Sequence, residues 1–309
     1  MFIPHPLFPG ARVALIAPAG PITPERLDAA VDTVKKLELD PVVFDSCLAS
    51  HGFFAGTDAL RAHDVNLAFA DRSVCGILCA RGGYGTQRIL PLLNISMIRK
   101  NPKYFSGYSD ITALHIALQQ RCGLVTYHTP MPAPEPWTRL DAFTLESLRR
   151  ALFSCPRGNY DNPPEQPRQC IVSGTASGPL TGGNLTVIAA SLGTPYEIDT
   201  RGKLLFLEEI GEEPYRLDRL LLQLKLAGKF RDCSGVLLGY CTECVPSRPE
   251  ASLTIPEILE EILVPEKRPV LAGIACGHSL PSLSLPFGIH FCMDAASGRL
   301  FAPGTPSRC

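Results

Sequence analysis

Short apolar runs alternate with segments of helical periodicity through the first part of the chain, and this alternation constrains the fold more than any other feature. The runs include "RVALIAPAG", "PVVFDS", "VCGILCA", "KYFSGYS" and "GLVTYH". The first of them is continuous enough for a strand buried on both faces. Repeated βα units of this length predict a mostly parallel sheet that is covered by helices.

The pattern changes after about residue 130, where prolines cluster in "PMPAPEPW" and "NPPEQPRQ" around one predicted helix, "DAFTLESLRRALF". We interpret this stretch as a connection between domains. The predicted organisation is an N-terminal α/β domain over residues 1–132, a proline-rich connection over 133–170, and a C-terminal α/β domain with a mixed sheet over 171–309.

Composition and charge exclude several classes of function. The 309 residues carry a formal net charge of -1, so no global field favours nucleic acid or an anionic membrane. No apolar run approaches the ~20 residues of a membrane span. The N-terminus lacks the basic start and long apolar core of a signal peptide. We therefore expect a cytoplasmic protein that has no nucleic-acid or membrane partner.

The twelve cysteines are predicted to be reduced core residues in a chain of this length. Cys241 and Cys244 form a Cys-x-x-Cys pair, but a zinc site would need a second pair or histidines at similar spacing, and none follows. We interpret both cysteines as structural and predict no metal and no cofactor.

Ser109 stands at a predicted corner between a strand and a helix, within "YFSGYSDITALH". Such a turn lifts a side chain clear of the sheet, at the positive end of the helix dipole, where backbone N–H groups can bind an oxyanion. These features suit a nucleophile. The alternative is that Ser109 only caps the helix and that Asp110 favours its dipole. The G-x-S-x-G elbow is also incomplete, because residue 111 is Ile.

A nucleophilic serine needs a base, and the chain offers seven histidines. His128 ends the strand-like segment "LVTYH". His278 follows an apolar strand, and the carboxyl end of a parallel strand is where α/β proteins place their chemistry. A loop histidine with satisfied hydrogen bonds explains His278 equally well. His115 lies more than one helical turn from Ser109, so its ring is not expected to reach back.

The base in turn needs an orienting carboxylate, and four glutamates are candidates. Glu208 and Glu209 end the apolar strand "KLLFLEE", and strand alternation sends them to opposite faces, so at most one reaches the site. If Glu208 is the orienting residue, Glu209→Gln is expected to leave the activity nearly unchanged. Glu212 and Glu213 precede a helix whose dipole they favour. Spacing alone does not choose among the four.

Several segments, in one order, resemble the serine LD-carboxypeptidases, a family that includes murein tetrapeptide LD-carboxypeptidases and microcin C immunity peptidases. The segments are "VALIAPAGP" at 13–21, "ARGGYG" at 80–85, "GYSDITALH" at 107–115, "YHTPM" at 127–131, "GPLTGGNL" to "RLDRLL" at 178–221, and "GIACGH" at 273–278. The resemblance covers nearly the whole chain. It implies a flavodoxin- or glutamine-amidotransferase-like N-terminal domain, a C-terminal α/β domain, a homodimer and no metal.

The resemblance also implies roles for individual residues. Ser109 would be the nucleophile, Glu208 the carboxylate of the triad and His278 the base. The oxyanion hole would consist of the backbone N–H groups of Gly83 and Asp110. Further candidates for binding the substrate are Arg81, Tyr84, His128 and Arg216.

The predicted function is that of a serine peptidase that releases the terminal D-Ala from murein tetrapeptide in peptidoglycan recycling. A related alternative is a microcin-C-type peptide-nucleotide amide hydrolase. An alternative of another class is a phosphate- or nucleotide-binding module, because "ARGGYGTQR" places glycines after a strand and before a helix. That segment lacks the Lys-Ser/Thr of a P-loop and the G-x-G-x-x-G of a dinucleotide fold.

Overall fold

A computed structural model describes residues 1–133 and 139–303, which form two compact units. Of the described residues, the first unit holds those up to Cys155 together with Ser284–Gly288, and the second holds Pro156–Leu283 and residues 289–303. These divisions differ from the predicted boundaries at 132 and 171. The proline-rich connection is shared between the units, and residues 134–138 of it lie outside the described residues.

The first unit is built on a six-stranded sheet of order β12-β5-β4-β3-β1-β2. Its strands are β1 (Arg12–Ile16), β2 (Asp40–Val43), β3 (Gly76–Cys79), β4 (Tyr104–Gly107), β5 (Thr126–His128) and β12 (Leu285–Phe287). The first five are parallel to their neighbours, whereas β12 runs antiparallel to β5. The order β2-β1-β3-β4-β5 is that of flavodoxin-like sheets, so the predicted architecture of this unit is confirmed.

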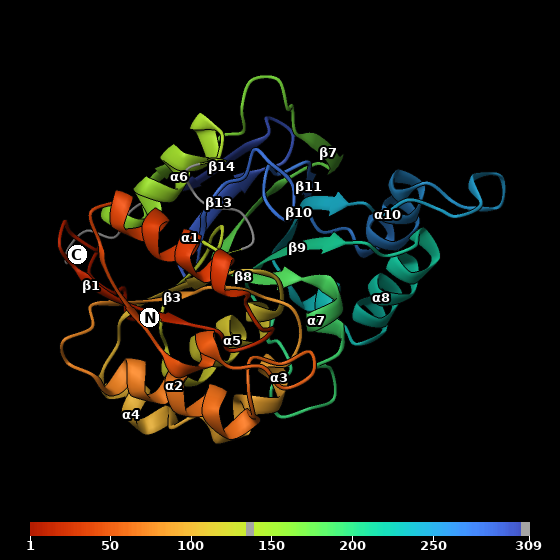
Figure 1. Ribbon diagram of the computed structural model, residues 1–309. Coiled ribbons are helices and arrows are strands. Elements are labelled where there is room, and N and C mark those ends of the chain that lie inside the picture. Colours follow the sequence, from red (N-terminus) through yellow and green to blue (C-terminus); the bar gives the residue numbers. More distant parts are fainter. Residues whose placement is uncertain (134–138, 304–309) are drawn as a thin grey trace. The chain divides into compact units, whose positions relative to one another are not determined.

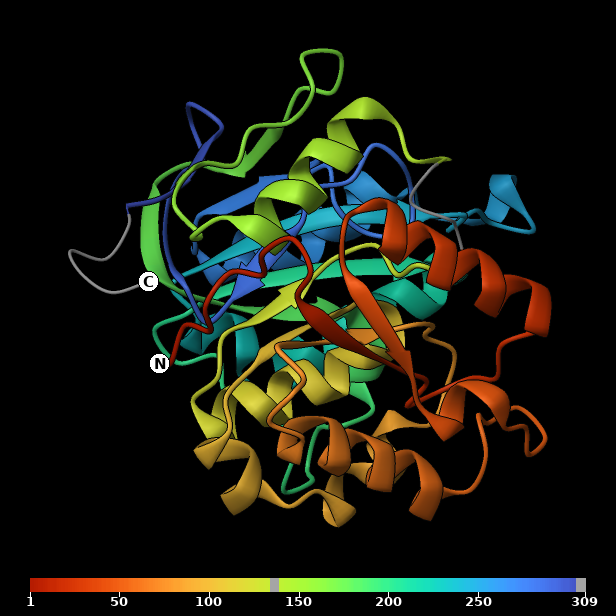
Figure 2. The same cartoon turned by 60° about the vertical axis from the view of Figure 1, so that its left-hand side comes forward.

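Helices cover both faces of this sheet. They are α1 (Pro24–Lys36), α2 (Asp58–Ala70), α3 (Thr86–Ile89), α4 (Ile95–Lys100), α5 (Thr112–Ala117) and α6 (Ala142–Phe153), with single turns η1 (Asp45–Leu48), η2 (Leu90–Leu92), η3 (Ser109–Ile111) and η4 (Leu118–Cys122). Figures 1 and 2 show α1 on one face of the sheet and α2 on the other. The N-cap of α1 is Thr23, whose hydroxyl accepts from the N–H of Arg26, and Pro24 occupies the first turn, as expected for a helix start.

The second unit contains an eight-stranded sheet of order β6-β14-β13-β8-β9-β10-β11-β7. Its strands are β6 (Gly158–Asn159), β7 (Gln169–Val172), β8 (Thr175–Asn184), β9 (Leu204–Ile210), β10 (Gly235–Thr242), β11 (Val270–Ala272), β13 (His290–Asp294) and β14 (Arg299–Ala302). Strands β8 to β11 are parallel, and the remaining pairs are antiparallel. The predicted mixed sheet is therefore confirmed.

The helices of the second unit are α7 (Leu185–Ala189), α8 (Pro214–Leu226), α9 (Lys229–Asp232) and α10 (Ile255–Leu263), with single turns η6 (Pro249–Ala251) and η7 (Val264–Glu266). Figure 1 shows α8 and α10 side by side. Each buries an apolar stripe, which includes Leu217 and Leu221 of α8 and Ile258 and Leu259 of α10.

The structure also bears on two other sequence predictions, the absence of a membrane span and the reduced state of the cysteines. Within residues 1–133 and 139–303, no helix is long and apolar enough to cross a membrane. Cys241 and Cys244 are free thiols, as are most other described cysteines, whereas Cys155 is disulfide-bonded and departs from the expectation of fully reduced cysteines.

Strand β12 is one of the elements that the sequence pattern did not reveal. It has only three residues, and one of them is Pro286, which an edge strand tolerates because it need not donate to the sheet. Its Phe287 is buried, with its ring centroid 5.4 Å from that of His115 and 5.5 Å from that of His128. A late segment of the chain thereby completes the core of the first unit.

We predict that Phe287→Ala lowers the free energy of unfolding by about 3–5 kcal/mol, because it leaves a cavity in a closed core. Phe8→Ala is the matched control, since the ring of Phe8 is 56% exposed. Urea unfolding of both variants checks this. Equal losses in the two variants would contradict the packing of β12 described above.

Candidate functional site

Ser109 adopts a left-handed backbone conformation, with φ of +65°, directly after β4. This region is strained for a residue with a Cβ atom and persists only when the surroundings enforce it. The side chain does not cap the following helix, because Tyr108 occupies the N-cap position and no side-chain capping bond is made there. The capping interpretation is thus unsupported, and the geometry is that of a strained strand-to-helix elbow.

Glycines let three segments of the first unit approach one another around Ser109. A Cβ atom on Gly82 would lie 2.9 Å from the Cβ of Ser109 and 3.2 Å from its Oγ. One on Gly20 would lie 2.9 Å from the carbonyl oxygen of Gly82, which accepts a hydrogen bond from the N–H of Gly20 at 2.9 Å. The loops after β1 and β3 therefore pack backbone to backbone beside the serine, at the carboxyl ends of these strands.

A buried polar network fixes the residue after the serine. The Oδ2 atom of Asp110 accepts from the N–H of Thr86 at 2.8 Å, and the Thr86 hydroxyl donates to the carbonyl oxygen of Asp110 at 2.6 Å. Burial raises the pKa of Asp110. The fully buried Arg61 donates to the carbonyl oxygens of Pro18 and Gly85, at 2.7 and 2.9 Å. These bonds tie the glycine-rich loop to the elbow.

The glycine-rich loop also carries three residues that the sequence nominated. Gly83 has φ of +117° and lies against Gly20. Arg81 donates to the carbonyl oxygen of Pro21 and is partly exposed. Tyr84 is half-exposed, and its ring centroid lies 5.8 Å from that of Phe53. Arg81 and Tyr84 therefore present a guanidinium and an aromatic ring from the loop that adjoins Ser109.

Two histidines of the first unit, His115 and His128, lie close to the elbow. The ring of His115 contacts the strands beside the elbow, because its Nε2 lies 2.9 Å from the carbonyl oxygen of Gly107 and its Nδ1 lies 2.8 Å from the Thr126 hydroxyl. Since a carbonyl oxygen only accepts, Nε2 carries the proton. His128 is buried, with its ring centroid 5.8 Å from that of Tyr108. Because it is buried, the His128 ring is better suited to pack in the core beside Tyr108 than to contact a substrate.

Glu208 and His278 are joined within the second unit. The Nδ1 atom of His278 lies 2.7 Å from Oε2 of Glu208, which is 2% exposed at the end of β9. Burial raises the pKa of Glu208, and the bond from His278 opposes that shift. A carboxylate that accepts from Nδ1–H leaves Nε2 as the nitrogen that can take up a proton, which is the arrangement of a general base.

The loop that carries His278 is held against the sheet by its backbone. A Cβ atom on Gly277, where φ is +139°, would lie 3.2 Å from Oε2 of Glu208. The N–H of Tyr240 donates to the carbonyl oxygen of Cys276 at 2.9 Å, and the hydroxyls of Thr242 and Ser279 are 2.7 Å apart. Glycine at 277 thus permits the close approach that brings the imidazole to its carboxylate.

Glu209 faces away from this pair, as strand alternation predicts, and it forms hydrogen bonds of its own. Its carboxylate is buried and accepts hydrogen bonds from the Asn184 side chain at 2.9 Å and from the N–H groups of Thr186 at 2.7 Å and Ile210 at 2.9 Å. An amide at this position would oppose an N–H donor to at least one of these N–H donors.

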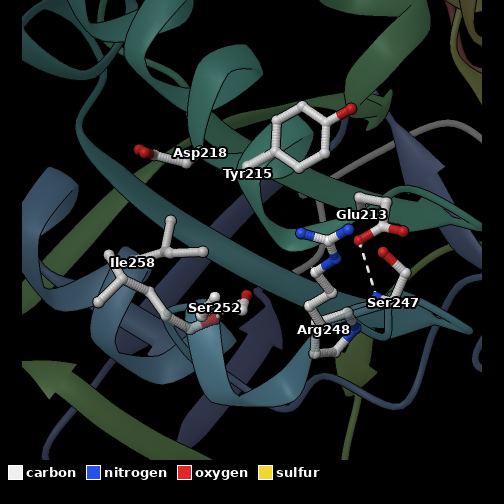
Figure 3. A pocket seen from close by; sticks show the side chains of 10 residues that line it. Glu213, Tyr215, Asp218, Ser247, Arg248, Ser252 and Ile258 are labelled. Carbon is white, nitrogen blue, oxygen red and sulfur yellow. Dashed lines mark hydrogen bonds between the residues drawn. The ribbon is translucent and has the colours of Figure 1, made fainter.

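Arg216 lies on the exposed face of α8, where its Nε donates to the Tyr215 hydroxyl at 3.0 Å and its Nη1 lies 3.7 Å from Glu212. Glu213 belongs to a neighbouring pocket of about 390 Å³ and accepts from the N–H of Ser247 at 3.1 Å. Figure 3 shows the Arg248 side chain directed toward Glu213 in this pocket.

None of the three predicted triad residues lines that pocket. A smaller cavity of about 230 Å³ includes Glu208 and Glu209 among its otherwise mainly apolar lining. We place the candidate chemistry at the Glu208–His278 pair, because an imidazole that a buried carboxylate orients is a reactive group, whereas a surface hollow alone is not.

The phosphate-binding alternative finds little support in the loop geometry. Helix α3 is a single turn, and the N–H of Thr86 at its start is already bonded to the Asp110 carboxylate. That amide cannot serve an anionic ligand at the same time. Within the described ranges, no group of three or more His, Cys, Asp or Glu side chains could hold a metal ion.

Sequence reasoning missed Arg61, Asn184 and the contact of His115 with Gly107. Asn184 was signalled only indirectly, by "LTGGNL", where two glycines precede a helix start. The role of Arg61 depends on the carbonyl oxygens of two distant loops, and a sequence pattern does not carry that information.

Comparisons with known proteins agree on one family. The model described as the LD-carboxypeptidase N-terminal domain matches residues 13–129, and the model of the LD-carboxypeptidase C-terminal domain matches residues 177–293. A probable murein peptide carboxypeptidase of Bacillus subtilis is 42% identical over 297 residues, which is 95% of this chain and 92% of the relative. A murein tetrapeptide carboxypeptidase of Pseudomonas aeruginosa is 32% identical over 285 residues, or 90% and 91% of the two chains.

Solved structures support the same fold. The wild-type apo structure of MccF, a microcin C7 self-immunity protein whose Escherichia coli sequence is also a relative, matches with a TM-score of 0.89 and 25% identity and covers 99% of each chain. Both units are thus represented in known proteins of similar architecture.

We predict that His115 makes the stability of the fold pH-dependent. Burial lowers the pKa of His115 from 6.5 to about 4. The unfolded chain therefore binds a proton near pH 6.5, whereas the folded chain binds it only near pH 4, so stability is present above pH 6.5 and is lost as the pH falls toward 4. The loss from this group is about 3 kcal/mol.

Urea unfolding at pH 7, 5.5 and 4.5 measures this loss. His115→Gln is the comparison, because glutamine cannot bind the proton, and its stability should fall less over the same pH range. Identical pH profiles for the two proteins would show that His115 is not the group responsible.

Proposed function

This chain belongs to the LD-carboxypeptidase family, and on that premise we propose that it is a serine peptidase that releases the terminal D-Ala from murein tetrapeptide in peptidoglycan recycling. The observation that carries the proposal is the 2.7 Å contact between Nδ1 of His278 and the buried Glu208. A buried carboxylate that orients an imidazole is the supporting half of a catalytic triad. The relatives named murein peptide and murein tetrapeptide carboxypeptidases support the choice of substrate.

In the proposed mechanism, Ser109 attacks the carbonyl carbon of the bond between the L-centre of the third residue and D-Ala. His278 accepts the serine proton at Nε2, and Glu208 stabilises the imidazolium that results. The tetrahedral intermediate collapses to an acyl-enzyme, and His278 returns the proton to the amine of the departing D-Ala. Water, activated by the same imidazole, then hydrolyses the acyl-enzyme.

The local geometry of Ser109 supports its role as nucleophile. Its left-handed conformation follows a buried strand, and Gly82 leaves room beside its Oγ. We assign the oxyanion hole to the backbone N–H groups of Gly83 and Asp110, because the bonds from Thr86 hold Asp110 rigidly. Preorganised N–H donors of this kind are typically worth a factor of about 10²–10³ in rate each.

A carboxypeptidase also has to recognise the free carboxylate of its substrate. Arg81 and Arg216 are the proposed cations, because both guanidinium groups are accessible. Tyr84, half-exposed beside Arg81, is the proposed apolar contact. The resemblance to the family further leads us to propose a homodimer that acts in the cytoplasm.

We predict that Ser109→Ala loses at least ~10³-fold in kcat while it folds normally, because the covalent route is removed. The measurement is mass spectrometry of products after incubation with murein tetrapeptides that carry lysine or diaminopimelate at the third position. Thermal unfolding of the variant provides the control for folding. Release of D-Ala at a near-wild-type rate would exclude Ser109 as the nucleophile.

For Glu208→Gln we expect a loss of roughly 10²–10⁴ in kcat, because an amide neither stabilises the imidazolium nor fixes its tautomer. The same assay measures this loss. Glu260→Gln on the exposed side of α10 is the matched control and should keep the wild-type rate. A Glu208→Gln enzyme with more than about a tenth of the wild-type kcat would require another orienting group.

The similarity to MccF favours a second candidate, the hydrolysis of an amide bond in a microcin-C-type peptide nucleotide. The two activities use the same triad and differ in what lies beyond the acyl group. Parallel assays with murein tetrapeptide and with an aminoacyl sulfamoyl adenosine separate them. A kcat/KM for the nucleotide above that for the tetrapeptide would reverse our choice.

A further inference from the structure

The N–H group of Gly83 is available to a ligand. Gly83 is exposed in the glycine-rich loop, and within residues 1–133 and 139–303 its N–H donates to no protein group. A donor for an oxyanion has to be unoccupied and also held in one orientation. Gly83 has φ of +117° and no side chain, so the residue itself restrains this orientation only weakly. The restraint has to come from its neighbours.

The glycine-rich loop is tied to the loop after β1 on both sides of this available N–H. Before it, the N–H of Gly20 donates to the carbonyl oxygen of Gly82 at 2.9 Å. After it, Nη1 of Arg61 donates to the carbonyl oxygens of Pro18 and Gly85, at 2.7 and 2.9 Å. The first tie is a backbone bond, whereas the second is made by a side chain. A point mutation can therefore remove the second tie and leave the first intact.

Arg61 is packed so that its guanidinium stays on these carbonyl oxygens. It lies on α2, is 0% exposed, and pairs through Nη2 with the carboxylate of Asp58. Its guanidinium carbon lies 4.8 Å from the centroid of the Phe54 ring. A Cβ atom on Gly85 would lie 2.7 Å from Nη1, so glycine there leaves the room that the guanidinium needs. The fixed fork of a guanidinium suits this set of acceptors, whereas lysine offers a compact ammonium on a flexible stem.

Arg88 has two of the same partners and so allows a direct comparison. Its Nη2 lies 2.7 Å from the carboxylate of Asp58, and its guanidinium carbon lies 4.9 Å from the centroid of Phe54. The side chain of Arg88 is 50% exposed, and among the described residues its guanidinium donates to Asp58 alone. The two arginines therefore share an anion and a ring, and they differ in the carbonyl oxygens of the two loops.

We propose that Arg61 is a positioning residue that holds the N–H of Gly83 in the orientation that an oxyanion requires. Arg61 does not touch the substrate. It fixes the loop after Gly83, and the backbone bond from Gly20 fixes the loop before it, so the N–H between them has one direction before a substrate binds. This inference rests on the proposed function insofar as Gly83 serves the oxyanion hole.

The experiment uses the full chain with Arg61→Lys, which keeps the charge, and with Arg61→Gln, which is neutral. Arg88→Lys is the matched control, because it changes the same type of residue on the same anion and ring. We expect both changes at Arg61 to lower kcat for murein tetrapeptide about tenfold or more, with KM changed less than about threefold. Loss of one oxyanion donor typically costs a factor of about 10²–10³, and a misdirected donor loses part of that. Arg88→Lys should keep the wild-type kcat.

A second readout does not depend on turnover. Nitrogen-15 relaxation gives the order parameter of the Gly83 N–H bond. We expect a value of about 0.8 or more in the wild type and in Arg88→Lys, and a value below about 0.6 in both Arg61 variants. If one Arg61 variant does not fold, the other decides. An order parameter below about 0.6 in the wild type would by itself contradict the proposal.

Two further results would overturn the proposal. One is a wild-type kcat in either Arg61 variant, even if its melting temperature falls, because Arg61 would then have a structural role only. The other is an equal loss of kcat in Arg88→Lys, which would assign the effect to Asp58 or Phe54. A wild-type protein that does not cleave the tetrapeptide would sink the proposed function instead, and the relaxation measurement would still test the positioning role.

Discussion

The hydrogen bond between Glu208 and His278 is the interaction on which the second unit depends. Taking a carboxylate out of water is costly unless donors surround it, and Glu208 is buried with burial raising its pKa. The structure compensates with the imidazole N–H of His278, which lies 2.7 Å from Oε2 of Glu208. It also needs glycine at 277, since a side chain there would crowd the carboxylate.

In the first unit the unfavourable feature is the backbone conformation of Ser109, and contacts of the neighbouring backbone stabilise it. Its left-handed conformation is unfavourable in isolation, so the neighbouring loops have to enforce it. Arg61 and His115 do so indirectly, because each is buried: Nη1 of Arg61 donates to the carbonyl oxygens of Pro18 and Gly85, and Nε2 of His115 donates to that of Gly107. Buried polar side chains therefore define the shape of the elbow, and the glycines allow the loops to come close enough.

The adjacent glutamates of β9, Glu208 and Glu209, have different hydrogen-bond partners. Glu208 contacts the imidazole of His278, whereas Glu209 accepts from an amide and from backbone N–H groups. The two-residue period of a strand explains why the two side chains point to opposite faces, but it does not explain why both residues are glutamates. The donors that each one meets supply that explanation, and they come from β8, α7 and the loop after β11.

The sequence alone determined the βα alternation, the parallel and mixed sheets and the family, because apolar periodicity and ordered motifs are local properties of the chain. It also separated Glu208 from Glu209. Only the tertiary structure decided that residues 285–287 complete the first sheet, that His115 bonds Gly107, and that the Asn184 amide donates to Glu209. These features are contacts between segments that lie far apart in the chain. Which hydrogen-bond partner a buried group meets depends on how the chain folds back on itself, and this leaves no periodic pattern in the sequence.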